Sequence, residues 1–404
     1  MKKNKIILLY SAILLSIIGA SCNKFLETDP PKDQVNSKFV FENDRNALAA
    51  LTGMYIRMPG YLKFELGMYT ALYADELSVV ASEPEHFLFY ESHVPYDLDI
   101  LNYYWNDCYR FIYIANSNIE GIAASSGITD SLKKQFTGEA LFFRAFTYLT
   151  LTNLFGPVPL VKSTAYQENL VLPQSSVDSV YTSIVDDLLQ ARTLLKETYP
   201  SKEKIRVNKW AATALLARVY LYMGNWKEAG EMSNEIIRSQ QYGALPPSEK
   251  VFLLNSPEAI LHLASNTNAK YVSDAYNYIP AASDVVPRYT ITEQLENAME
   301  AGDKRKENWL GFNTVEGKKY FYPSKYKNNT GGTVTEYFML LRLAEQYLIR
   351  AEAYAHSDQF NLAVSDLNVV RQRAGIELIP PATIHSREQL LDLILHERRV
   401  EFFT

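Results

Sequence analysis

Cysteine is scarce in this sequence, whose 404 residues include only Cys22 and Cys108. Two cysteines allow at most one intrachain disulfide, so a disulfide framework cannot hold the chain together. A chain of this length can bury a large apolar core without cross-links. Because Cys108 lies in an aromatic stretch with helical periodicity, we expect it to be a small buried apolar residue.

Basic charge is not in excess either. The chain has 40 Lys and Arg against 46 Asp and Glu, which gives a net charge of -6. The basic residues are also spread along the chain rather than clustered. Neither a nucleic-acid-binding surface nor a basic membrane patch is therefore expected.

Motifs of the common enzyme classes are missing as well. The sequence contains no HExxH, no GxSxG, no Walker A loop and no GxGxxG. Its six histidines lack ligand spacing on a common helix, and only His86 and His93, seven residues apart in a loop-like segment, leave a metal site open. These absences favour a protein with no metal and no cofactor.

Neighbouring carboxylates are the remaining catalytic candidates. Three such pairs are Asp75 and Glu76, Asp97 and Asp99, and Asp186 and Asp187. A glycosidase pair requires a defined separation in a cleft, whereas adjacent acids in an acidic sequence are more simply solvated. We interpret Asp186 and Asp187, on a predicted helix, as surface charges, and we predict that the protein is not an enzyme.

The N-terminus carries an export signal. Lysines at positions 2, 3 and 5 precede an apolar run from Ile6 to Gly19, which is too short for a permanent membrane span. Small residues lead directly to Cys22, as in a bacterial lipobox, although Gly19 stands where leucine is usual. The sequence predicts a signal peptide over residues 1–21 and lipidation at Cys22. The alternative is ordinary signal cleavage with Cys22 incidental.

Residues 22–42 are predicted to form the lipidated N-terminus and a polar, proline-containing tether. Several acyl chains exceed the limit of reversible single-chain binding, so such an anchor would be permanent. The body of the protein would then remain in water beside the membrane.

A helix-turn-helix pattern recurs along the body. Ala217, Tyr220, Trp226 and Ala229 are spaced by 3, 6 and 3 residues, and the same spacing starts again at Ala351. This is the tetratricopeptide (TPR) arrangement, in which alanines allow two helices to approach closely. TPR-like units are predicted at about 136–195, 207–239 and 337–375, and Ala217 and Ala351 are expected to be buried. The fold class is predicted to be all-α.

Two segments without helical period interrupt this scaffold, at about 59–104 and 240–336. Gly331 and Gly332 suggest a hairpin turn between two short strands in the second. The sequence contains 28 Tyr, and many of them fall in these segments. Aromatic rings can stack on the apolar face of a sugar, while Asp and Arg can bind its hydroxyls. The predicted ligand-binding residues are Trp309, Tyr278, Tyr320, Tyr322, Tyr73, Asp75, Tyr90 and Arg288, with Trp309 as the first choice for a stacking platform.

Six runs of the sequence together resemble the SusD/RagB family of nutrient-binding lipoproteins. They are CNKFLETDPP, YYWNDCYRFIYIANSNIEGI, GEALFFRAFTYLTLTNLFGPVPLV, VNKWAATALLARVYLYMGNWKEA, LAEQYLIRAEAYAHSDQFNLAVSDLNVVRQRAG and LLDLILHERRVEFF. The resemblance implies a single SusD-like helical domain over 43–404 at the surface of the outer membrane. There it would bind glycans or peptides and deliver them to a SusC-type TonB-dependent transporter used in polysaccharide utilisation. Family members continue beyond the last run, so the C-terminal end is expected to be truncated.

Two other functions remain open at this point. A lipoprotein that acts as a TPR-type protein interaction scaffold would have an open concave groove and no small-molecule site. A glycoside hydrolase would need a carboxyl pair in a cleft. The binding lipoprotein is the leading hypothesis.

Overall fold

The computed structural model describes residues 37–61, 64–80, 83–264 and 270–404. The predicted signal peptide, Cys22 and most of the tether lie outside the described residues. The predicted all-α class with a TPR-like scaffold and minor strands is confirmed. Within the described residues, no helix is long and apolar enough to pass through a bilayer.

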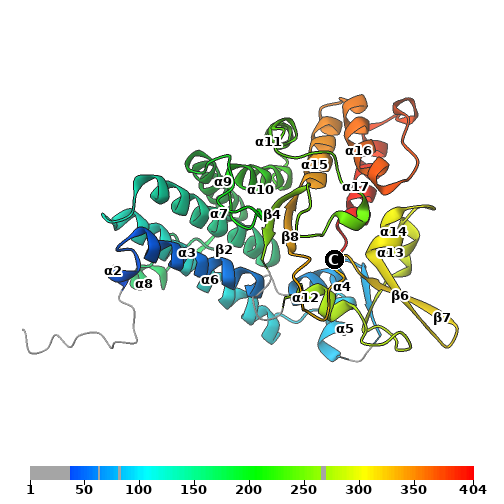
Figure 1. The fold of residues 1–404 in the computed structure, drawn as a ribbon, viewed down its shortest axis with the longest axis horizontal. Helices are drawn as coiled ribbons and strands as arrows, with labels where there is room; N and C mark the ends of the chain where they lie inside the picture. The colour runs from blue at the N-terminus through cyan, green and yellow to red at the C-terminus, as the bar shows by residue number, and fades with distance from the viewer. Residues whose placement is uncertain (1–36, 62–63, 81–82, 265–269) are drawn as a thin grey trace, which may run out of the picture.

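A series of mostly long helices forms the scaffold, which runs from the left side to the upper right of Figure 1. Its helices are α2 (Ser37–Val40), α3 (Asp44–Tyr61), α6 (Asp99–Ala124), α7 (Asp130–Phe155), α9 (Val177–Leu194), α10 (Lys209–Tyr222), α11 (Trp226–Arg238), α15 (Leu343–His356), α16 (Phe360–Ala374) and α17 (Arg387–Phe402). Short elements over the α7–α9 connection are β2 (Val158–Pro159), α8 (Tyr166–Asn169) and β3 (Gln174–Ser175).

Local signals set several helix ends. The Ser386 hydroxyl accepts from the Gln389 amide at 3.1 Å and so caps α17. Gly224 follows α10 and Gly375 follows α16, and each has a φ of 73°. Glycine adopts this left-handed conformation without strain. These residues explain why the chain can reverse sharply between packed helices.

Helices that are far apart in sequence are consecutive in space. Helix α11 packs against α15, so the TPR-like unit at 337–375 continues the superhelix of the unit at 207–239 across an interval of about a hundred residues. At this junction the Trp226 ring stacks on His356 with centroids 3.7 Å apart. Ala217 and Ala351 are fully buried, as the spacing predicts.

One buried ion pair corrects the interpretation of a carboxylate as surface charge. Asp187 is 4% exposed and accepts two hydrogen bonds from the Arg144 guanidinium, at 2.7 and 2.8 Å. Arg144 also donates to the Asn116 side chain at 2.8 Å. These hydrogen bonds thus link α9, α7 and α6. The helical period of α9 places Asp187 on the inner face, which the acidic composition of this stretch did not indicate.

Most of the other elements form a second region at the lower right of Figure 1, built largely from segments 59–104 and 240–336, while β4 (Ala259–Leu263) and β8 (Phe338–Arg342) lie at the centre, between this region and the scaffold. The elements of the second region are α4 (Phe64–Tyr73), β1 (Leu77–Val79), α5 (Pro84–Tyr90), η2 (Ser248–Lys250), α12 (Ser273–Tyr278), β5 (Tyr289–Ile291), α13 (Glu293–Ala298), α14 (Lys304–Trp309), β6 (Leu310–Val315) and β7 (Lys318–Pro323), and η3 (Pro381–Thr383) precedes α17. Segment 59–104 is therefore more helical than expected. Its helices are short and bury aromatic residues, so a long amphipathic period does not develop.

The hairpin lies elsewhere than the glycine pair suggests. Strands β6 and β7 pair around a turn at Glu316 and Gly317, while β8 pairs with β4. The loop around Gly331 is instead held by hydrogen bonds from backbone amides to a side chain. The Glu336 carboxylate accepts from the Lys327 and Asn328 amides at 2.9 and 3.0 Å, which replaces a strand ladder.

A buried ionic cluster joins this region to the end of the scaffold. Glu401 of α17 is fully buried and accepts hydrogen bonds from Arg305, Arg342 and Arg373. Burial alone would raise the pKa of the Glu401 carboxyl, yet the three guanidinium groups hold it well below its ordinary value. Arg305 also pairs with Glu397 at 2.5 Å, so α14 and α17 are held by several charges.

Candidate functional site

A cleft opens where the two segments meet. Strand β1 pairs with β5 through the register Ser78 to Thr290, and the hydroxyls of these two residues lie 2.7 Å apart. Beside this pairing is a cavity of about 530 Å³. Its walls come from α4, α5, α12, β5 and the start of α6; the labels α4, α5 and α12 lie close together in Figure 1. The lining residues are Met68, Tyr69, Glu83, Glu85, His86, Asp99, Ile100, Tyr103, Asn277, Arg288 and Tyr289.

The floor of the cleft consists of buried aromatic rings that pack against one another. Tyr69, His86 and Tyr289 are each at most 5% exposed. The His86 ring centroid lies 5.6 Å from Tyr69 and 5.7 Å from Tyr289, and burial lowers the pKa of His86. Such packed rings give the cleft a preformed base.

The rim carries the accessible groups. Tyr103 is 39% exposed and stands in the first turns of α6. Arg288 forms an ion pair with Glu83, whose other oxygen lies 3.2 Å from His86 Nε2. The remaining polar lining includes Glu85, Asp99 and Asn277, so carboxylates outnumber cations. The arrangement can offer one ring face and several hydrogen-bonding groups to a polar ligand.

Arg288 is the predicted ligand residue that the structure places in this cleft. Trp309 is not an exposed stacking platform, because it is 1% exposed and its Nε1 donates to the Ser248 carbonyl at 2.8 Å. Tyr278 is 4% exposed and packs edge-on against Tyr289 beneath the cleft. Both rings therefore belong to the core.

The other five predicted residues lie outside the lining. Tyr73 is 56% exposed at the end of α4 and Tyr90 is 39% exposed at the end of α5. Asp75 has a φ of 58°, and its carbonyl accepts from the Thr292 hydroxyl at 2.7 Å, so its backbone supports the β1–β5 junction. The hairpin strand β7 carries the half-buried Tyr320 and Tyr322.

Sequence reasoning missed Tyr103, Glu83 and Asn277. Tyr103 falls near the end of the predicted segment 59–104 without helical period, but the structure places it in α6, which begins at Asp99 and extends its first turns to the cleft. Glu83 stands one residue before the proline that starts α5, a helix that was not expected. A helix-start signal at Pro84 could have suggested it.

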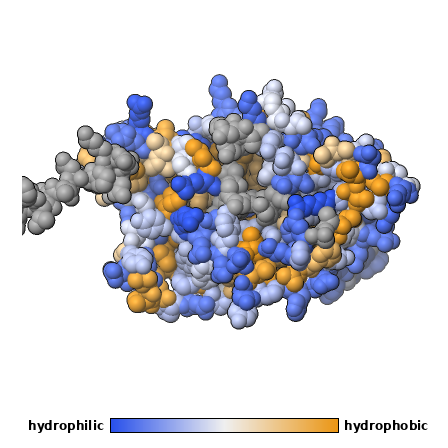
Figure 2. Space-filling model, turned by 90° about the horizontal axis from the view of Figure 1, so that it is seen from below, coloured by the Kyte–Doolittle hydropathy of each residue, from blue (hydrophilic) through white to orange (hydrophobic). Residues whose placement is uncertain are grey.

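The face seen in Figure 2 is largely hydrophilic with separate apolar patches, of which a conspicuous one lies toward the end that carries the β6–β7 hairpin. Exposed apolar side chains of this region include Phe312 at 51% and Val285 at 44%. In the described part of the chain, no group of three or more His, Cys, Asp or Glu is arranged to hold a metal ion.

The chain matches two family descriptions that together cover most of its length. "Starch-binding associating with outer membrane" matches residues 24–221, and "SusD family" matches residues 258–404. SusD-like protein P25 of Formosa agariphila is 25% identical over 62% of this chain and 49% of its own length, so the match spans about half of that relative. A SusD-like protein of Bacteroides ovatus is 22% identical over 99% of this chain and 80% of its own.

Solved structures agree with the sequence matches. A laminarin-binding SusD-like protein has a TM-score of 0.74 at 23% identity, covering 89% of this chain and 88% of that protein. A likeness at this identity concerns the fold, which the two chains share over nearly their whole lengths. With both family descriptions and the fold in agreement, this chain belongs to the SusD/RagB family.

Proposed function

We propose that this protein binds a glycan in the cleft between α5, α6 and β5 and passes it to a SusC-type transporter of the outer membrane. The observation that carries the proposal is the cleft itself, which the accessible Tyr103 ring lines together with three buried aromatic rings and with Arg288, Asn277 and Asp99. A cavity of this size with few oriented polar groups suits a small ligand. The starch-binding description of the family and the laminarin-binding neighbour support a sugar.

The charges of the lining favour a neutral glycan. Arg288 is paired with Glu83, and the depressed pKa of His86 keeps that ring neutral at pH 7. Glu85 and Asp99 then leave the cleft with net negative charge, which repels sulfate and carboxylate groups. We therefore expect laminarin oligosaccharides to bind more tightly than their sulfated derivatives.

Replacing Tyr103 with alanine should weaken glycan binding at this cleft by about tenfold or more, because the ring supplies the stacking face; a tenfold loss corresponds to about 1.4 kcal/mol. Isothermal titration with neutral and sulfated laminarin oligosaccharides measures the change in affinity. Tyr90→Ala is the matched control, since Tyr90 is also 39% exposed but lies outside the lining. If both variants lose the same affinity, or if Tyr103→Ala loses none, the glycan does not bind in this cleft. A parent protein that binds no glycan would favour the interaction-scaffold function.

We also propose that a lipid at Cys22 holds the protein at the membrane. Cys22→Ser removes the acylated thiol and should move the protein from the membrane pellet into the soluble fraction, as seen by fractionation and immunoblotting. Cys108→Ser is the control, because Cys108 is buried in α6 and so offers no thiol at the surface for acylation. Persistence of Cys22→Ser in carbonate-washed membranes would show that another anchor operates.

A further inference from the structure

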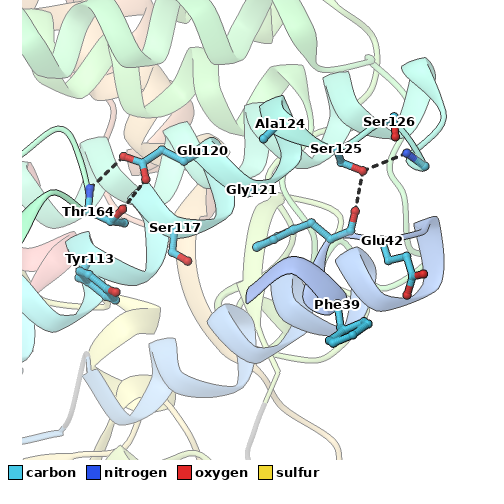
Figure 3. A pocket seen from close by; sticks show the side chains of 12 residues that line it. Phe39, Glu42, Tyr113, Ser117, Glu120, Gly121, Ala124, Ser125, Ser126 and Thr164 are labelled. Atoms are coloured by element: carbon cyan, nitrogen blue, oxygen red, sulfur yellow. Dashed lines mark hydrogen bonds between the residues drawn. The ribbon is translucent and has the colours of Figure 1, made fainter. Parts of the chain in front are cut away.

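A second hollow lies along the same helix α6, far from its start. Its volume is about 590 Å³. Figure 3 shows it beneath α6, with Tyr113 and Thr164 at one side and Phe39 at the other. The lining residues are Phe39, Phe41, Glu42, Tyr113, Ser117, Glu120, Gly121, Ala124, Ser125, Ser126, Gly127 and Thr164.

The lining combines accessible rings with hydroxyls. Phe39 is 55% exposed and Tyr113 is 53% exposed, so both rings are accessible to a ligand. Between them Ser117 points into the space from α6 (Figure 3). Among the described residues of the lining there is no lysine or arginine, and Glu42 and Glu120 are its acids. These groups suit an uncharged ligand with an apolar face and many hydroxyls.

One wall of the hollow is fixed by contacts between α6 and the α2–α3 connection. The Ser125 hydroxyl donates to the Phe41 carbonyl at 2.5 Å. The Phe41 ring fills the space left by Gly121, where a Cβ atom would lie 2.1 Å from that ring. The Thr129 amide adds a bond to the Asp44 carboxylate at 2.8 Å. A ligand would therefore meet a preformed surface on this side and pay little ordering entropy.

The opposite wall is fixed as well. Glu120 accepts hydrogen bonds from both the amide and the hydroxyl of Thr164. Asn116, which is fully buried, donates to the Val161 carbonyl at 3.0 Å. The loop that carries Thr164 is thus tied to α6 at two points.

We propose that this hollow is a second saccharide-binding site, with Tyr113 and Phe39 as stacking surfaces for neutral sugar units. The inference rests on the proposed glycan-binding function. Residues 103 and 113 lie about 15 Å apart along the helix axis, at 1.5 Å per residue, so one helix carries a ring of each site. Two weak sites on one protein would retain a polymer more strongly than a short oligosaccharide, since the second contact forms at high effective concentration.

The test compares Tyr103→Ala, Tyr113→Ala and the double variant in titrations with laminarin oligosaccharides and in affinity electrophoresis with laminarin polymer. Tyr103→Ala should retain weak binding at one site per chain, and adding Tyr113→Ala should abolish it. Tyr113→Ala alone should reduce polymer retention about tenfold or more and leave oligosaccharide affinity at the cleft unchanged. Ser117→Trp, which fills the hollow, should act like Tyr113→Ala.

Tyr166→Ala is the control, because Tyr166 is 67% exposed on the adjacent α8 and does not line the hollow. Thermal melts verify that each variant is folded. A single site in the parent, together with polymer retention that neither Tyr113→Ala nor Ser117→Trp changes, would overturn this inference while leaving the first cleft intact. Loss of all binding in Tyr103→Ala alone would overturn it as well. A parent that binds no saccharide would overturn both proposals.

Discussion

Trp309→Ala is expected to lower the free energy of unfolding by about 3–5 kcal/mol, the usual cost of truncating a large buried aromatic. Trp309 is 1% exposed and joins α14 to strand β6. Its ring packs against Phe252 with centroids 5.4 Å apart and against Phe403 at 6.4 Å. The substitution also leaves the Ser248 carbonyl without the indole N–H that it accepts at 2.8 Å.

Denaturant unfolding followed by circular dichroism measures this loss. Phe312→Ala is the control, since Phe312 lies three residues further on in β6 and is 51% exposed; it should change stability by about 0.5 kcal/mol or less. Binding of laminarin oligosaccharides by the folded fraction of Trp309→Ala should match the parent. A variant with parental stability and lost binding would instead place Trp309 at the ligand.

Glu401→Ala is expected to cost about 3–5 kcal/mol, because it leaves buried guanidinium groups without their shared carboxylate. Arg342 and Arg373 both donate to Oε1 of Glu401, and Arg305 donates to Oε2 at 3.0 Å. Arg305 keeps Asp303 and Glu397 as partners, and Arg342 keeps the Glu258 carboxylate and the backbone carbonyl of residue 401. The larger part of the cost should therefore come from Arg373, whose remaining carboxylate, that of Glu258, lies 3.9 Å away.

The control is Asp392→Ala on the same helix, because Asp392 is exposed. Thermal and denaturant melts of the two variants should differ clearly, with Asp392→Ala close to the parent. If Glu401→Ala melts like the parent, the guanidinium groups find other partners or water, and the cluster contributes little to stability.

The TPR-like units were predictable because their signal is local. A close approach of two helices requires small residues at fixed positions, so Ala217 and Ala351 could be read directly from their spacing to the following tyrosine and aromatic. Both are fully buried. Helix ends marked by Gly224 and Ser386 were readable for the same reason.

The candidate site was less predictable because burial there depends on distant segments. Trp309 sits in a polar stretch, GDKRKENWLGFN, and becomes buried only because η2 and the end of α17 fold over it. Tyr103 lies in the predicted segment 59–104 without helical period, and only the folded chain shows that it belongs to the first turns of α6, which reach the cleft. That the two segments meet follows from the β1–β5 pairing, which joins residues more than 200 positions apart.

The contact between α11 and α15 has a consequence for the order of folding. A chain that grows from its N-terminus completes α11 at Arg238, but the helix that covers its outer face begins only at Leu343. Until then, the groove that will receive α15 is unfilled, and the intervening residues must close a long loop at an entropic cost that rises only slowly with length. Early pairing of β1 with β5 would order part of this intervening chain and so make the loop that α15 must close effectively shorter. Synthesis from the N-terminus therefore delivers all the residues that line the cleft, the last of which is Tyr289, before the helix α15 that completes the superhelix.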